Sequence, residues 1–194
     1  MPETTTRPEP RTTALSLIRT TALDEVARRE HSGDAPPPAN WEMYNGLTAT
    51  LGNWHAADTL REDSLLLTEW LAVEFCGYLF QQLNQDRARL DRWLRDFGDQ
   101  VCQSQQHEHP AGPTAMEIMS VVAGDVAAHP EGPAGAERLA GIGLSYLWYL
   151  REDHEVEDAR EMALTFALWA GQQLAALMHH DAERIRSCMD ARDC

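Results

Sequence analysis

Residues 65–80, LLLTEWLAVEFCGYLF, form an apolar segment that is interrupted by only two glutamates. Successive residues of an α-helix are rotated by about 100°, and at this spacing no polar stripe runs along the segment. Apolar and polar residues do not alternate as they do in a half-buried strand. The pattern therefore predicts a helix that is buried on most sides, and such a helix needs other helices around it.

The rest of the chain also favours helices, and no alternating strand pattern occurs in it. Between Ala57 and about Gln105 there is no proline, which predicts one long helix, or two joined by a kink, over residues 60–104. A short helix or two turns are expected at residues 41–56, and further helices at 114–128, 134–151 and 156–189. We therefore predict an all-α domain at 41–189, a bundle of about four main helices with a long central buried helix, followed by a tail at 190–194. No internal repeat is evident.

The N-terminal part differs in composition from this domain. Residues 1–12 are polar and contain prolines, so we expect a disordered tail. Residues 13–30 carry apolar side chains at helical spacing and predict an amphipathic helix. Residues 31–40, HSGDAPPPAN, include three consecutive prolines that favour an extended linker. The helix is therefore tethered, and it either folds back onto its own body or docks on another chain.

The composition excludes several classes of chemistry. The formal net charge is −15, and all 16 basic residues are arginines. Schiff-base and pyridoxal-phosphate chemistry and the phosphate-binding Walker A loop all need a lysine, so these classes are excluded. An acidic chain is also a poor partner for nucleic acid, whose phosphates are bound through clustered basic residues.

The N-terminal residues do not have the pattern of a signal peptide. The apolar segments are shorter than the roughly 20 residues that a helix needs to cross a bilayer. The four cysteines form no C-x-x-C pair. We expect a cytoplasmic protein with reduced thiols that does not contact a membrane.

Glu69 is the one candidate for a catalytic residue. On a helical wheel it lies among apolar side chains, where a carboxylate must be paired, protonated or part of a pocket wall. If the helix at 156–189 packs against this one, Gln173 is a possible partner. In one interpretation the pair fixes the helix register. In the other, a carboxyl with a raised pKa lines an apolar pocket together with aromatic and polar side chains, namely Trp70, Trp169, Gln173, Tyr146 and Trp148.

Metal ligands are only weakly indicated. Cys102, His107, His109 and His154 are expected at the same end of a helical bundle. However, no Glu-x-x-His pair of the di-iron type occurs, and the histidine spacing is not that of a zinc site. We interpret these histidines as solvated loop residues and expect no cofactor.

These observations favour a non-enzymatic interaction or regulatory protein that binds another protein or self-associates. The tethered helix, the acidic surface and the lack of catalytic motifs support this hypothesis. The alternative is a small-molecule-binding module or an enzyme with an apolar pocket around Glu69. In that case a small molecule would be the partner.

Overall fold

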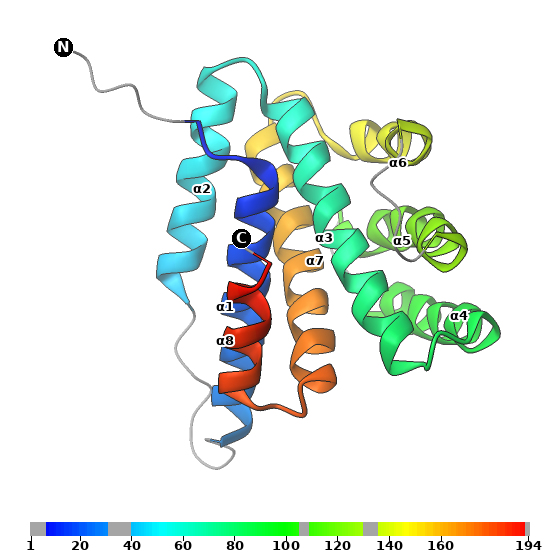
Figure 1. Ribbon diagram of the computed structural model, residues 1–194. Helices are drawn as coiled ribbons and strands as arrows, with labels where there is room; N and C mark the ends of the chain where they lie inside the picture. The colour runs from blue at the N-terminus through cyan, green and yellow to red at the C-terminus, as the bar shows by residue number, and fades with distance from the viewer. Residues whose placement is uncertain (1–6, 31–39, 105–108, 130–135, 193–194) are drawn as a thin grey trace.

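The computed structural model describes residues 7–30, 40–104, 109–129 and 136–192, and within these ranges it contains eight α-helices and no strand (Figure 1). The predicted all-α class is confirmed, but the arrangement is not specifically a four-helix bundle. The helices are α1 (Pro10–Glu30), α2 (Trp41–Ala56), α3 (Leu60–Gln82), α4 (Arg87–Ser104), α5 (Ala111–Ala128), α6 (Ala136–Tyr149), α7 (Glu155–Leu177) and α8 (Ala182–Asp190). None of these described helices is long and apolar enough to cross a membrane.

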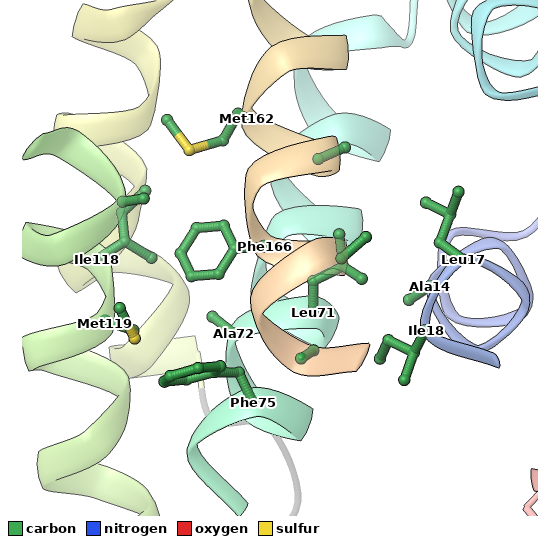
Figure 2. Packing of buried hydrophobic residues seen from close by; sticks show 14 of the residues in the cluster. Ala14, Leu17, Ile18, Leu71, Ala72, Phe75, Ile118, Met119, Met162 and Phe166 are labelled. Carbon is green, nitrogen blue, oxygen red and sulfur yellow. The ribbon is translucent and has the colours of Figure 1, made fainter. Parts of the chain in front are cut away.

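Two helices, α3 and α7, lie side by side at the centre, and the other helices pack around them (Figure 1). The apolar segment of residues 65–80 lies within α3. Its side chains contact α7, α5 and α1, and Figure 2 shows Phe75, Phe166 and Ile118 packed together in this core. Because α3 meets neighbours on several sides, it has no solvent-facing polar stripe.

The segment 60–104, predicted as one long helix or two joined by a kink, forms α3 and α4, and the single helix predicted at 156–189 is divided into α7 and α8. The chain reverses after α3 at Asn84 and Gln85, and after α7 at His179 and His180. All four residues have φ between 57° and 59°, the left-handed conformation that ends a helix. Neither glycine nor proline occupies these turns, so the sequence carries no local signal for them.

The same four-helix arrangement occurs twice in the chain, which the sequence did not suggest. Helices α3 and α7 are both 23 residues long, and the turns after them are hydrogen-bonded alike. Gln85 N–H donates to Phe80 C=O at 2.8 Å, and His180 N–H donates to Ala175 C=O at 2.7 Å. We refer to α1–α4 as the first half and to α5–α8 as the second half.

The helix contacts show how the two halves are placed. Helix α1 packs on α7 and α8, and its counterpart α5 packs on α3 and α4. Likewise α2 packs on α7, and α6 packs on α3. An approximate two-fold axis between α3 and α7 explains this exchange of partners, and it places α2 and α6 on opposite sides of the central pair (Figure 1).

The N-terminal helix folds back onto its own body. It begins at Pro10 rather than at residue 13, so the end of the predicted disordered tail is helical. Thr21 Oγ1 donates to the carbonyl of Ala167 in α7 at 2.8 Å. Residues 1–6, most of the predicted linker and residues 193–194 lie outside the described residues.

Candidate functional site

Glu69 lies in a buried ion network that joins three helices. Its Oε1 accepts a hydrogen bond of 2.9 Å from Nε of Arg138 in α6. A second guanidinium nitrogen of Arg138 pairs with Asp125 in α5. The side chains of Glu69 and Arg138 are almost completely buried. A buried carboxylate with a bound guanidinium is compensated in charge, so the geometry favours a structural role over acid–base chemistry.

The sequence suggested Gln173 as the partner of Glu69, and here the structure differs. The side-chain amide of Gln82 donates to the backbone oxygen of Gln173 at 2.7 Å and to its Oε1 at 3.0 Å. The sequence does not indicate Arg138 as a partner, because it lies 69 residues from Glu69 and on a helix whose buried face the sequence does not identify.

The remaining residues of the predicted pocket lie in different parts of the molecule. Trp169 belongs to an aromatic cluster with Phe75, Phe97 and Phe166. The ring of Trp70 lies beneath the guanidinium of Arg11, at 5.6 Å from its centroid. None of these contacts is centred on Glu69.

Tyr146 is fully buried, and its hydroxyl has no hydrogen-bond partner among the described residues. Burial raises the pKa of this phenol, while the nearby hydroxyls of Ser64 and Thr68 act in the opposite direction. The group therefore stays neutral and is not poised to act as a base.

The candidate metal ligands do not converge. Cys102 and His154 are exposed, and His107 lies outside the described residues. The His109 ring stacks on Tyr149, and its Nε2 lies 2.7 Å from the backbone oxygen of Tyr149. In the described part of the chain, no group of three His, Cys, Asp or Glu side chains is placed to hold a metal ion.

The feature that most clearly stands out at the surface is on α6. Leu144, Leu147 and Trp148 are 68%, 44% and 82% exposed, and we call these three residues the α6 face. The opposite side of the helix is buried through Ile142, Tyr146 and Tyr149. Residues 139–150, LAGIGLSYLWYL, carry no charge, and this uncharged stretch is the feature of the sequence that indicates an apolar surface here. Trp148, which the sequence suggested as an interior pocket residue, is instead the most exposed of the large apolar side chains that the structure describes.

The equivalent helix α2 has no large apolar side chain at the corresponding positions, and its exposed tryptophan, Trp41, lies at its first residue. Helices α3 and α7 begin 95 residues apart, at Leu60 and Glu155, and at this offset the α6 face corresponds to Ala49, Gly52 and Asn53 of α2. All three are exposed, but none is a large apolar residue. The two helices have nearly the same pattern of burial and differ in what they present to solvent.

A hollow of about 370 Å³ lies beside the α6 face, between α5 and α6. Its lining combines aromatic rings, hydroxyls and one carboxylate, and includes His109, Thr114, Glu117, Ser145, Trp148 and Tyr149. A larger hollow of about 570 Å³ lies between α1 and α2. Two of its hydroxyls, those of Thr13 and Thr20, donate to the backbone carbonyls of Glu9 and Ser16, at 3.0 and 2.9 Å. The smaller hollow therefore presents the more distinctive chemistry.

Comparisons with known proteins add no relative: no family model, no curated protein and no solved structure matches this chain. The class that the structure defines is an all-α protein with a repeated four-helix arrangement. Its candidate functional site is the α6 face with the adjoining hollow.

Proposed function

We propose that the protein is a non-enzymatic interaction module that binds a helical segment of another protein along the α6 face. The observation that carries the proposal is the 82% exposure of Trp148 next to two exposed leucines, at positions where the equivalent helix α2 has small or polar residues. Aromatic side chains bury about 150–250 Å² each and are enriched in protein interfaces. An exposed apolar patch of several hundred Å² is often a functional surface.

The spacing of the α6 face suits a helix as the partner. Leu144, Leu147 and Trp148 recur at intervals of three and four residues, so they form one stripe along α6. Ala140 and Gly141 continue this stripe with small exposed residues, which allow a second helix to approach closely. An amphipathic partner helix can place its apolar side along this stripe.

The charge of the chain indicates what the rest of the partner helix carries. The net charge is −15, and the exposed residues Glu117, Glu152 and Asp153 lie on α5 and just beyond the end of α6. A basic partner is attracted to such a rim, whereas a second copy of this chain is repelled. We therefore assign the α6 face to a partner helix with an apolar side and arginine or lysine at its edge.

The test uses a designed helical peptide of leucine, alanine and arginine, labelled for fluorescence anisotropy. We expect saturable binding that the double variant Leu144→Ser, Trp148→Ser weakens by about 10-fold or more, because large anchors dominate such interfaces. The matched control is the pair Ala49→Ser and Asn53→Ser on α2, which should leave the affinity unchanged.

Three results would overturn the proposal. One is the absence of saturable binding, and another is an equal loss of affinity in both sets of variants. The third is a dimer, seen by light scattering, that becomes monomeric in the Leu144→Ser, Trp148→Ser variant. That result would assign the α6 face to a second copy of this chain.

A further inference from the structure

We infer that the hollow between α5 and α6 is a subsite for an organic cation, the guanidinium or ammonium group of a basic side chain. The inference deepens the proposed function and rests on it for the source of the cation, since Leu144 and Trp148 of the α6 face also line the hollow. The argument depends on the aromatic walls, on the charge around the hollow and on its size.

Aromatic rings line much of the hollow. Trp148 forms no ring contact with another aromatic residue that the structure describes, and it is largely exposed, so its face is free to accept a ligand. His109 and Tyr149 also line the hollow as a stacked pair, with ring centroids 4.4 Å apart and ring planes inclined by 10°. The face of an indole ring attracts a cation through its quadrupole.

The electrostatics favour positive charge at the same place. Glu117 is exposed, lines the hollow and makes no ion pair with any described residue. Ser145, Trp148 and Tyr149 belong to the C-terminal end of α6, where the helix dipole is negative. Arg151 is the next basic residue along the chain, and its guanidinium is bonded to Asp158. Neither it nor any other arginine is among the residues that line the hollow.

The size and remaining polar groups fit a side-chain terminus. A volume of about 370 Å³ is within the usual range for sites that hold small ligands. Thr114 and Ser145 add hydroxyl oxygens that can accept hydrogen bonds from a guanidinium. The chemistry of the hollow thus matches arginine better than an apolar side chain.

The experiment compares two helical peptides that differ at one position, arginine in one and the neutral isostere citrulline in the other. We expect the arginine peptide to bind about 5- to 10-fold more tightly, in keeping with a cation near an indole face and a carboxylate. Glu117→Gln should reduce this preference, leaving the part due to the Trp148 ring, and should leave the affinity for the citrulline peptide unchanged. The control Glu42→Gln removes one negative charge from α2, beside the other hollow, and should preserve the preference.

Failure of the subsite and failure of the proposed function give different results. If both peptides bind equally well, the cation subsite is overturned while docking on the α6 face stands. If neither peptide binds, the proposed function fails. A titration with N-acetylarginine amide then tests whether the hollow binds a cation on its own. A shift of one indole N–H resonance that Trp148→Phe removes would support the subsite, and the absence of any such shift would overturn it.

Discussion

The two halves of the molecule share one backbone plan and differ in the chemistry that holds it together. In the contact between α3 and α6, Glu69 and Arg138 form a buried ion pair. The equivalent positions in α7 and α2 are Leu164 and Met43, which are packed against the apolar core. The same helix arrangement is therefore compatible with either an ionic or an apolar contact, and the helix geometry alone does not dictate the choice.

A second difference concerns how closely the helices approach. Gly171 in α7 lies against α1, and a Cβ atom added there would be 2.8 Å from the backbone nitrogen of Ala22. Its counterpart in α3 is Cys76, whose Sγ lies 3.9 Å from the carbonyl oxygen of Met119 in α5. Helix α1 thus packs more tightly on α7 than α5 does on α3.

The largest effect is expected from breaking the ion pair. Arg138→Met leaves Glu69 buried without its partner, and we expect a loss of about 3–5 kcal/mol in the free energy of unfolding. The double variant Glu69→Leu, Arg138→Met places the residues of the apolar contact, Leu164 and Met43, at the equivalent positions of the α3–α6 contact, and it should recover most of this loss. Urea unfolding gives the free energy of unfolding of both variants. A double variant as unstable as Arg138→Met would show that the two contacts are not interchangeable.

A somewhat smaller effect is expected at the close contact of α1 and α7. Gly171→Ala places a methyl group against backbone atoms that cannot move aside, so we expect a loss of about 2–3 kcal/mol in unfolding free energy. Cys76→Ala, the matched change in α3, removes only a sulfur atom and should lose about 1 kcal/mol. Thermal and urea unfolding give both values, and equal losses would contradict the proposed difference in packing.

The smallest effect concerns two buried carboxylates, Asp63 in α3 and Asp158 in α7, which occupy equivalent positions. Burial alone would raise the pKa of Asp158, but hydrogen bonds from Arg151 outweigh it and hold the pKa below its usual value. A lowered pKa stabilises the fold above the unfolded value of about 3.9, and this contribution is lost as the pH falls through the folded value.

Arg151→Gln should therefore lower the unfolding free energy by about 1–2 kcal/mol at pH 7, since a charge-assisted hydrogen bond is lost. The difference from the unmodified protein should shrink below about pH 4, as Asp158 becomes protonated. Urea unfolding between pH 7 and pH 3 tests this. Arg186→Gln, which removes an exposed pair with Glu183, is the control and should have an effect of at most about 1 kcal/mol at any pH. A difference that does not depend on pH would contradict the assignment.

Much of the helix content could be predicted from the sequence, because apolar spacing is a local property. Residues 41–56, for which a short helix or two turns are expected, form helix α2, and the predicted limits of α5 and α6 are within three residues of the observed ones at either end. The turns at Asn84–Gln85 and His179–His180 could not be predicted, since these residues adopt a left-handed conformation without the glycine that usually marks it.

The repeat left only a faint trace in the sequence. The pattern Asp-x-x-x-Glu-Asp occurs at residues 58–63 and again at 153–158, at the start of the two central helices. Few other identities connect the halves, because many different apolar side chains can fill equivalent core positions. The repeat was therefore visible only once the helix contacts were known.

For the candidate site, the sequence by itself determined that Glu69 must be paired, protonated or part of a pocket wall, and that residues 139–150 carry no charge. Both statements follow from composition and helical spacing. Only the tertiary structure decided that Arg138 supplies the compensating charge and that the uncharged segment turns Leu144, Leu147 and Trp148 toward solvent. The physical reason is that the exposed side of a helix depends on which neighbours cover it, and those neighbours come from distant parts of the chain.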